Sequence, residues 1–395
     1  MVSSRGLFLF SLLLTSFITK SDAKLVTFDN VVGLKYDING NILDAHDGII
    51  RKFPSTGTND YYLLGLSYGD CHEPANLGCD QTPDKCGFQF NHSIHLWSSP
   101  DLSNSSWTYI TELAPVSARP QGTVFRPDLI YNSNTGLFVL WYNWVAANGT
   151  YMGFAAYTSP TISGTYTLQK EVVQLTHANS TYHAGDFHLY VSDPDANGNT
   201  TAYVIYGAEF WMWIDKLTPD FLGTTGEFVN QLGGIYFVEA PALIKYNNVY
   251  YAIFDHCCCF CYQGSGIRVY TAPDPLGPWT VQGGDRACEP PSMTPASSLT
   301  TYYTLDTNVH ASPTPGQGCL YNNSNYVSVT RSQQSYIAQV DTPTGPVMVW
   351  VGDRWQQSPD TLKSHDPQYH YPLQFDKNGV VQNVSWIDSF TLDVI

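Results

Sequence analysis

Two runs decide the fold class of this chain: Phe237-Val238-Glu239-Ala240-Pro241-Ala242-Leu243-Ile244-Lys245 and Tyr250-Tyr251-Ala252-Ile253-Phe254. Apolar and aromatic side chains alternate in both, and Tyr246-Asn247-Asn248 between them is a typical turn, so the stretch predicts a β-hairpin. Glu239 is a carboxylate in an otherwise apolar strand. Because burial penalises the ionised form, an acid placed here has a raised pKa and can donate a proton near neutral pH. The alternative at this stage is a strand-end glutamate that points into solvent.

The same pattern recurs along the chain. An aromatic strand, a loop and a strand that ends in Ser/Ala-Pro occur at 61–68 with 93–101, at 136–142 with 151–160, and at 249–254 with 266–274. Turn residues interrupt the chain about every 8–12 residues, and helical periodicity of useful length is absent after the N-terminal apolar segment. Four-stranded repeats of about this period are typical of β-propeller blades.

We therefore predict an all-β fold, a five-bladed β-propeller. The expected blades lie near 40–115, 120–178, 182–233, 236–285 and 325–395, and the first strand after Lys24 is expected to complete the last blade. Residues 286–324 lack the blade pattern and carry Cys288 and Cys319. They are expected to form a long, disulfide-anchored loop.

The N-terminus has the pattern of a secretory signal peptide over residues 1–23. Arg5 supplies the positive charge, Leu7 to Ile18 the apolar run and Ser21-Asp22-Ala23 a small-residue cleavage site. Residues 24–395 are then expected to be one secreted domain that acts as a monomer. Asn-X-Ser/Thr sequons fit a glycosylated surface, and they lie at Asn91, Asn104, Asn148, Asn179, Asn199, Asn322 and Asn383.

Composition narrows the classes of partner. The net charge of −16 disfavours nucleic acid and anionic membranes as partners. Only 13% of residues are charged whereas 14% are aromatic, a balance that suits an aromatic-rich β protein with stacking surfaces for sugars. In an oxidising compartment the nine cysteines should mostly pair, with one left over, and the run 257–261 is expected to be held by disulfides rather than by a metal.

Polar residues open the first strand of each predicted blade, so they should converge on the propeller axis. These segments are Asp44-Ala45-His46-Asp47, Phe125-Arg126-Pro127-Asp128, Gly185-Asp186, Glu239-Ala240-Pro241 and Ser332-Gln333-Gln334. Carboxylates that meet in one aromatic-lined cavity are the arrangement that glycoside hydrolysis requires. For Asp128 and Arg126 the alternative is a buried structural role.

These blocks, in this order, resemble glycoside hydrolase family 43, and most closely its exo-β-1,3-galactanase subfamily. The matching motifs are Ala45-His46-Asp47-Gly48, Arg126-Pro127, Asp186-x-x-Leu189, Glu239-Ala240-Pro241-Ala242, Ser332-Gln333 and Gly352-Asp353-Arg354-Trp355. The similarity covers nearly all of the chain after the signal and is weakest at 70–90 and 286–324. It implies an inverting glycosidase that acts on β-1,3-galactan or arabinogalactan-type polysaccharide.

The resemblance also implies roles. Glu239 matches the general acid, Asp186 the carboxylate that tunes that acid, and Gln333 the amide that positions or activates water, with a register that leaves Gln334 as its alternative. Asp353, Arg354 and Trp355 match a segment that lines the cavity. The remaining candidates for substrate binding are His46, Asp44, Phe125, Arg126, and His256 at the end of the strand that pairs with Glu239.

Three positions depart from the family pattern. Phe125 stands where the family often has a glutamate that holds sugar hydroxyls, and Gly185 stands where it usually has an arginine. Asp47 stands where the subfamily usually has glycine, near the place of the wider family's general base. A carboxylate is a better base than a neutral amide, so we hypothesise that Asp47, or Asp44, activates water in this chain.

Two further functions stay open from the sequence. An α-L-arabinofuranosidase or β-xylosidase of the same family is one, because Phe125 loosens the galactose assignment. A carbohydrate-binding propeller without activity is the other. No His/Asp/Glu set has the spacing of a catalytic metal site, so we expect no required cofactor, although a structural ion on the propeller axis is compatible with the sequence.

Overall fold

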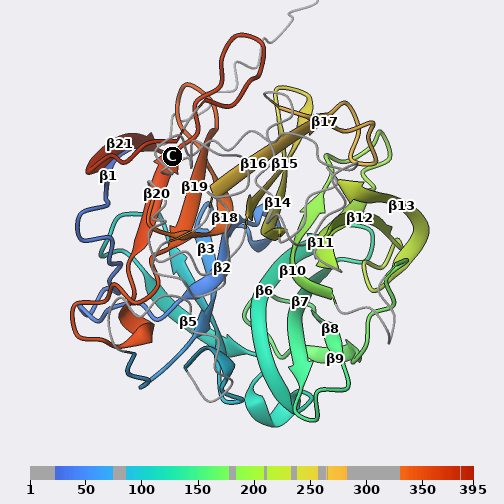
Figure 1. Ribbon diagram of the computed structural model, residues 1–395, viewed down its shortest axis with the longest axis horizontal. Helices are drawn as coiled ribbons and strands as arrows, with labels where there is room; N and C mark the ends of the chain where they lie inside the picture. The colour runs from blue at the N-terminus through green and yellow to red at the C-terminus, as the bar shows by residue number, and fades with distance from the viewer. Residues whose placement is uncertain are drawn as a thin grey trace, which may run out of the picture.

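The computed structural model describes residues 23–73, 86–177, 184–208, 211–232, 238–256, 264, 266–282, 330–382 and 384–395. Its strands form five blades in a ring, which confirms the predicted five-bladed β-propeller (Figure 1). The predicted loop at 286–324 and the cysteines at 257–261 lie outside the described residues.

Four blades are four-stranded antiparallel sheets in chain order. The first blade contains β2 (His46–Lys52), β3 (Tyr61–Ser67), β4 (Ser93–Ser99) and β5 (Thr108–Leu113). The second contains β6 (Gly122–Asn132), β7 (Leu137–Ala146), β8 (Met152–Ser159) and β9 (Thr167–Lys170). The third contains β10 (Ala184–Val191), β11 (Ala202–Ala208), β12 (Trp211–Leu217) and β13 (Thr224–Leu232). The fourth contains β14 (Val238–Tyr246), β15 (Val249–His256), β16 (Gly266–Ala272) and β17 (Thr280–Val281).

The fifth blade contains β18 (Gln333–Val340), β19 (Val347–Asp353) and β20 (Gln368–Pro372). We expected the first strand of the chain to complete this blade, but β1 (Lys24–Asp29) instead forms a two-stranded sheet of its own with the last strand, β21 (Ser389–Val394). That sheet lies beside β20, because Asn30 Nδ2 donates to the carbonyl of His370 and the His370 N–H donates back to Asn30 Oδ1, both at 2.8 Å.

Short 3-10 turns are the helical elements of the described residues: η1 (Pro54–Thr56), η2 (Cys86–Phe88), η3 (Val116–Ala118) and η4 (Lys363–His365). Within those residues no helix has the length and apolar character that crossing a bilayer needs. The aromatic residues mostly fill the spaces between blades. Trp141, for example, is completely buried between the second and third blades, where its Nε1 donates to the Phe221 carbonyl at 3.0 Å, so the buried indole keeps a hydrogen-bond partner.

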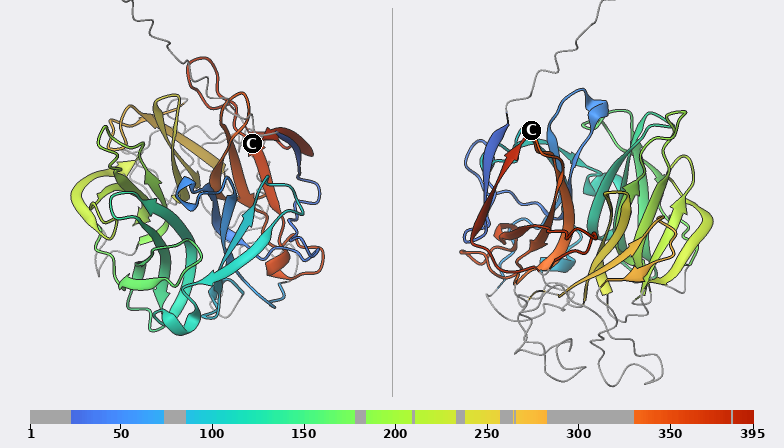
Figure 2. Two further views of the ribbon diagram at one scale, coloured as in Figure 1. Left: turned by 180° about the vertical axis from the view of Figure 1, so that it is seen from behind. Right: turned by 90° about the horizontal axis from the view of Figure 1, so that it is seen from above.

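The five innermost strands, β2, β6, β10, β14 and β18, lie next to one another around the axis (Figure 2). Each carries a β-bulge within its first half, opposite its partner strand. A bulge inserts unpaired residues and redirects their side chains. The residues inserted in the first four strands are Asp47-Gly48, Arg126-Pro127, Gly185-Asp186 and Ala240-Pro241.

Three of these bulges are strained. Asp47, Arg126 and Ala240 have φ angles of 50°, 43° and 49°. The left-handed region costs a residue with a side chain about 1–3 kcal/mol and persists only where the surroundings fix it. These three strained residues lie at the end of the ring where the sequence places the candidate site.

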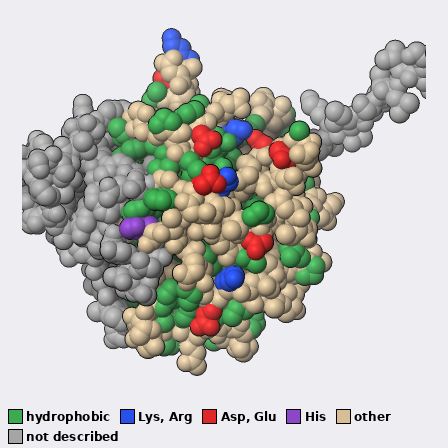
Figure 3. Space-filling view, turned by 90° about the vertical axis from the view of Figure 1, so that its right-hand side faces the viewer, with side chains coloured by type: hydrophobic (Ala, Val, Ile, Leu, Met, Phe, Trp, Pro, Cys, Tyr) green, Lys and Arg blue, Asp and Glu red, His purple; other side chains and the backbone are tan. Residues whose placement is uncertain are grey.

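The side of the molecule seen in Figure 3 carries few charged side chains, scattered among hydrophobic and uncharged polar ones. This agrees with the low share of charged residues in the sequence. Among the described residues on this side, the few Lys and Arg side chains do not form a broad basic patch.

Candidate active site

Glu239 lies at the start of β14, directly before its bulge, and its side chain is only partly exposed. Burial, and after it the negative charges of Asp186 and Asp47, raise the pKa of this carboxyl to about 8 against the opposing effect of Arg126. Its Oε2 accepts a hydrogen bond from Gln333 Nε2 at 3.2 Å. At neutral pH Glu239 is therefore protonated and able to donate its proton.

Asp186 is fixed beside Glu239 from two directions. Its Oδ2 lies 3.0 Å from Arg126 Nε and accepts the backbone N–H of Ala240, also at 3.0 Å. Arg126 is itself held by the carbonyls of Ser335 and Gln334, to which its Nη1 and Nη2 donate at 3.0 and 3.1 Å. Bulges on three different strands thus place a carboxylate and a guanidinium next to the candidate acid.

Asp47 is a second carboxylate at the same end of the ring and is only 5% exposed. Its Oδ2 accepts the Tyr68 hydroxyl at 2.7 Å, and its Oδ1 lies 3.5 Å from Arg126 Nη2. Burial raises the pKa of Asp47 above its ordinary value, while Arg126 lowers it and the carboxylates Asp353 and Asp186 raise it. A carboxylate with a raised pKa is a stronger base once it is ionised.

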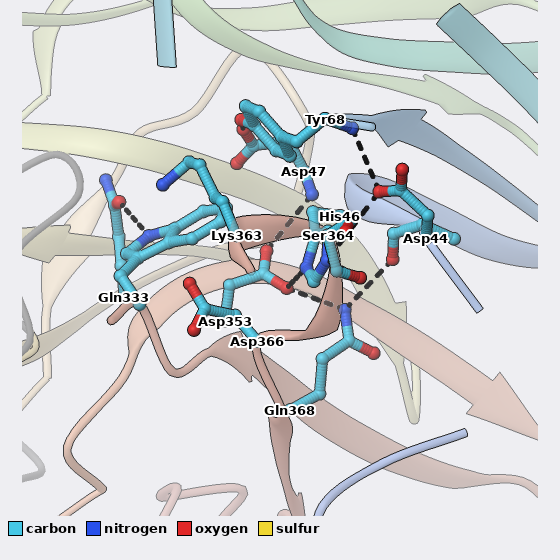
Figure 4. Close-up of polar contacts among 12 residues, drawn as sticks. Asp44, His46, Asp47, Tyr68, Gln333, Asp353, Lys363, Ser364, Asp366 and Gln368 are labelled. Atoms are coloured by element: carbon cyan, nitrogen blue, oxygen red, sulfur yellow. Dashed lines mark hydrogen bonds and ion pairs between the residues drawn. The ribbon is translucent and has the colours of Figure 1, made fainter. Parts of the chain in front are cut away.

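Asp353 and His46 form a buried network behind Asp47 (Figure 4). Asp353 Oδ1 lies 3.2 Å from His46 Nδ1 and accepts Gln368 Nε2 at 2.7 Å, while its Oδ2 accepts the Asp47 N–H at 3.1 Å. Burial acts to lower the pKa of His46, but the hydrogen bond and charge of Asp353 prevail and raise it to about 9. Burial likewise acts to raise the pKa of Asp353, and its bonds to His46 and Gln368 hold it at about 2. The pair is an ion pair at neutral pH that fixes the strained Asp47 backbone.

Gln333 and Gln334 have different surroundings. Gln333 faces Glu239, and its Oε1 accepts Trp355 Nε1 at 2.9 Å. Gln334 is fully buried, and its amide bonds to the carbonyls of Ala240 and Ile253 and to the Trp350 indole. Gln333 is thus the amide next to the candidate acid, and Gln334 joins blades four and five.

Solved structures similar to this chain include glycoside hydrolases. An exo-β-1,3-galactanase from Clostridium thermocellum is 22% identical with a TM-score of 0.61, over 93% of this chain and 67% of that one. An exo-β-1,3-galactanase from Phanerochaete chrysosporium, solved with galactose, is 20% identical with a TM-score of 0.61, over 91% and 67% of the two chains. This chain has the fold of glycoside hydrolase family 43.

Other members of that family agree in fold over most of their length. A family 43 β-1,3-galactosidase solved with galactodeoxynojirimycin is 20% identical with a TM-score of 0.57, over 90% of this chain and 97% of that one. No protein-family model and no curated protein matches this sequence. The resemblance drawn from the motifs is therefore confirmed in the fold, at a low level of sequence identity.

Three of the other predicted residues remain: Asp44, Arg354 and His256. The Asp44 carboxylate accepts the N–H groups of Tyr68 and Gly69 at 2.9 and 2.8 Å and so fixes the turn after β3. Arg354 Nη1 donates to the Asn30 carbonyl at 2.9 Å, and thus joins the fifth blade to the N-terminal segment. Of His256, the last residue of β15, only the backbone is described, paired with Val238 and Gly266.

Two of the three departures from the family 43 pattern remain: Phe125 directly precedes the bulge of β6, and Gly185 lies within the bulge of β10. Phe125 is partly buried and meets the Phe88 ring edge-on, with ring centroids 5.9 Å apart. Gly185 does not need to be glycine for steric reasons, because an added Cβ would first meet Met152 Cε at 3.4 Å, an ordinary contact distance. Phe125 therefore places an apolar ring, and Gly185 open space, beside the charged groups of the bulges.

Three residues that support the candidate site were not predicted from the sequence: Tyr68, Gln368 and Lys363. Tyr68 and Lys363 lie in a turn and a 3-10 segment, and Gln368 begins the last strand of its blade. None stands in a repeated position on an innermost strand, so blade periodicity gave no signal for them. The short aromatic-to-Gly turn Tyr68-Gly69 next to a strand end was the one available clue.

Among the described residues, no group of three or more His, Cys, Asp or Glu is arranged to hold a metal ion. One disulfide lies within them, between Cys71 and Cys86, and it joins the start of the first blade's β3–β4 connection to η2 later in the same connection. The expectation that the cysteines mostly pair is thus confirmed for these two, while the loops expected to be held by disulfides lie outside the described residues.

A cavity of about 790 Å³ lies at the other end of the innermost strands, lined among others by Arg51, His188 and Lys245. The guanidinium of its lining residue Arg51 lies 3.1 Å from Asp128, whose Oδ2 also accepts the Leu189 N–H at 2.7 Å. None of the acid, tuning or base candidates lines this cavity. Asp128 therefore has the structural role that the sequence allowed, and the candidate site remains at the bulged end of the ring.

Proposed function

We propose that this chain is an inverting glycoside hydrolase that removes β-1,3-linked galactose from galactan or arabinogalactan-type polysaccharide. The observation that carries the proposal is Glu239: a carboxyl group with a pKa of about 8, placed at the start of an innermost strand beside two further carboxylates. A proton donor opposite an ionised carboxylate is the pair that inverting hydrolysis needs, with about 6.5–9.5 Å between them to admit a water.

Glu239 donates its proton to the departing glycosidic oxygen. Asp186 keeps that proton in place, because its negative charge raises the pKa of Glu239. Gln333 fixes the orientation of the acid through its hydrogen bond to Oε2, and is in turn held by the Trp355 indole.

Asp47 activates the attacking water. Its Oδ1 is only loosely engaged, at 3.5 Å from Arg126, whereas both ends of the Gln333 amide are used by Glu239 and Trp355. A carboxylate also accepts a proton far more readily than a neutral amide. These contacts support Asp47 rather than Gln333 as the base, and Asp44 is occupied by backbone N–H groups.

The galactose assignment is supported by proteins of the same fold. Two of the similar structures are exo-β-1,3-galactanases and a third is a β-1,3-galactosidase. Phe125 favours the second candidate, an α-L-arabinofuranosidase or β-xylosidase, because an apolar ring cannot bind sugar hydroxyls as the family's usual glutamate does. A carbohydrate-binding propeller without activity is the third candidate, and the raised pKa of Glu239 weighs against it.

The proposal extends to the setting of the enzyme. We infer a secreted, glycosylated monomer, supported by the signal-like segment 1–23 and by the exposed sequon residues Asn91, Asn104, Asn148 and Asn199. Both the proton donor and the base are supplied by the chain, so hydrolysis as proposed requires no cofactor.

The deciding experiment measures reducing sugar released from β-1,3-galactan, arabinan, xylan and aryl glycosides by the wild type and by Glu239→Gln. We expect release from the galactan that falls about 10²–10⁴-fold in the variant, the usual contribution of a general acid. Glu227→Gln is the matched control, since Glu227 is an exposed residue of β13 that pairs with Lys216. Activity on arabinan or xylan alone would favour the second candidate, and glycan binding without hydrolysis the third.

A further inference from the structure

Lys363 is a buried cation next to the candidate active site. Its side chain has no exposed surface, and its Nζ lies 3.5 Å from Oε2 of Glu73, which is also buried. Desolvating two charges costs several kcal/mol, so a buried ion pair is weak support for stability by itself. Its surroundings point to another role.

The Lys363 ammonium faces two aromatic rings. Its Nζ is 4.0 Å from the centre of the Trp355 ring and 4.9 Å from that of Tyr68, both within the range of cation–π attraction. The two rings meet edge to face, with centroids 5.7 Å apart. In Figure 4, Lys363 lies between Tyr68 and Gln333.

Each ring holds one group of the proposed reaction. The Tyr68 hydroxyl donates to Asp47 Oδ2 at 2.7 Å, and the Trp355 indole donates to Gln333 Oε1 at 2.9 Å. A cation over an aromatic ring fixes the plane of the ring and polarises its O–H or N–H group, which strengthens both donated bonds.

The ion pair is anchored where the sequence resembles family 43 least. The Glu73 N–H donates to the Thr361 carbonyl at 2.7 Å, and the Lys363 N–H donates to the Cys71 carbonyl at 3.0 Å. Cys71 is bonded to Cys86. The segment around the disulfide therefore supports Lys363 directly.

We propose that Lys363 is a positioning residue that fixes Tyr68 and Trp355, and through them the base and the amide that orients the acid. This inference rests on the proposed hydrolysis. Lys363 does not act on the sugar, so its loss affects turnover and leaves substrate affinity largely unchanged.

Steady-state kinetics of Lys363→Met test the proposal. We expect kcat to fall about 10–100-fold, the cost of misplacing reacting groups by a fraction of an ångström to 1 Å, with KM within about twofold of the wild type. Because Met leaves Glu73 buried without its ion pair, Glu73→Gln/Lys363→Met is measured in parallel and should show the same kcat. Lys245→Met, at the opposite end of the ring, is the control and should keep wild-type kcat.

A double-mutant cycle separates positioning from a general loss of stability. If Lys363 acts through Tyr68, Tyr68→Phe adds little to the loss of kcat caused by Lys363→Met. If the two substitutions instead lower kcat independently, so that their effects multiply, the inference is overturned. It is also overturned if the wild type hydrolyses galactan and the Lys363 variants keep the wild-type kcat.

A second readout does not depend on activity. The Trp355 indole N–H, identified by its loss in Trp355→Phe, should be protected from hydrogen exchange in the wild type and exchange at least about tenfold faster in Lys363→Met. Unchanged protection overturns the positioning role even if the chain proves to be inactive, so this failure is distinguishable from a failure of the proposed function.

Discussion

Arg126 Nε lies 3.0 Å from Asp186 Oδ2, so the guanidinium of one bulge and the carboxylate of the next form a direct ion pair beside the proposed acid. The same oxygen of Asp186 accepts the N–H of Ala240, the residue that follows Glu239. The position and the protonation state of Glu239 therefore depend on the Arg126–Asp186 ion pair. Asp186 raises the pKa of Glu239, and Arg126 lowers it.

Asp186→Asn should therefore move the alkaline limb of the pH–activity profile. In the wild type, activity should fall as the pH rises through about 8, where Glu239 loses its proton. The variant lacks the charge that holds this proton and leaves the charge of Arg126 less compensated, so the limb should shift to lower pH and kcat/KM at pH 7 should fall about 10–100-fold. An alkaline limb that stays near 8 in the variant would show that Asp186 does not tune the acid.

Asp47→Asn and Gln333→Leu rank the two candidates for water activation. Asp47→Asn keeps the shape of the side chain and removes the base, so we expect a loss of about 10²–10⁴-fold in kcat. Gln333→Leu removes a hydrogen bond to the acid, but the lost amide is a much weaker proton acceptor than a carboxylate. Its kcat should therefore fall less, by about tenfold. The opposite ranking, measured on one aryl galactoside at pH 6 and 7, contradicts the assignment of the base to Asp47.

The fold was predictable from the sequence because strand alternation and turn spacing are local signals that repeat. The hairpin around Glu239 and the aromatic strand pairs became β14–β15, β3–β4 and β7–β8. The first strand, β1, was correctly expected beside the fifth blade, but its pairing with the last strand, β21, was not predicted. Pairing between the two ends of a chain depends on long-range contacts such as those of Asn30 with His370, which no local pattern records.

The site was predictable as far as it lies on the innermost strands. Glu239, Asp186, Arg126 and Asp47 lie together, since each stands at a bulge that the blade repeat places at the same end. The choice between Gln333 and Gln334 needed the structure, because a bulge shifts the register by one residue. Lys363 and Tyr68 come from irregular segments, and their proximity follows from packing of the loops.

Stability should depend on the charge of Glu239. The carboxyl group has an ordinary pKa of 4.5 and a pKa of about 8 in the folded chain, so the folded state binds the proton more tightly. This stabilisation is fully present below about 4.5 and is lost as the pH rises to about 8. Glu239→Gln avoids burying a charge, so this variant should be more stable than the wild type at pH 9 by about 2 kcal/mol. This free energy is smaller than the full pKa difference would give, because the Glu239 side chain keeps some contact with solvent.

Urea unfolding at pH 4 and pH 9 checks this expectation. The two proteins should have similar free energies of unfolding at pH 4 and diverge at pH 9. Glu227→Gln, an exposed position, should show no such divergence. Equal stability of the wild type and Glu239→Gln at both pH values would mean that Glu239 is not desolvated and that its pKa is ordinary.

Phe125→Glu tests the departure that bears on the sugar. Phe125 directly precedes the Arg126 bulge and is partly exposed, so a glutamate placed there can reach a bound sugar without being fully buried. If it accepts hydrogen bonds from galactose hydroxyls, kcat/KM for an aryl β-galactoside should rise about tenfold relative to an aryl arabinofuranoside or xyloside, the value of one hydrogen bond to a charged group. Phe125→Leu is the control that removes the ring without adding a carboxylate. A rise for the pentosides instead, or an equal change with Leu, would show that this position selects substrates by shape rather than by their hydroxyl groups.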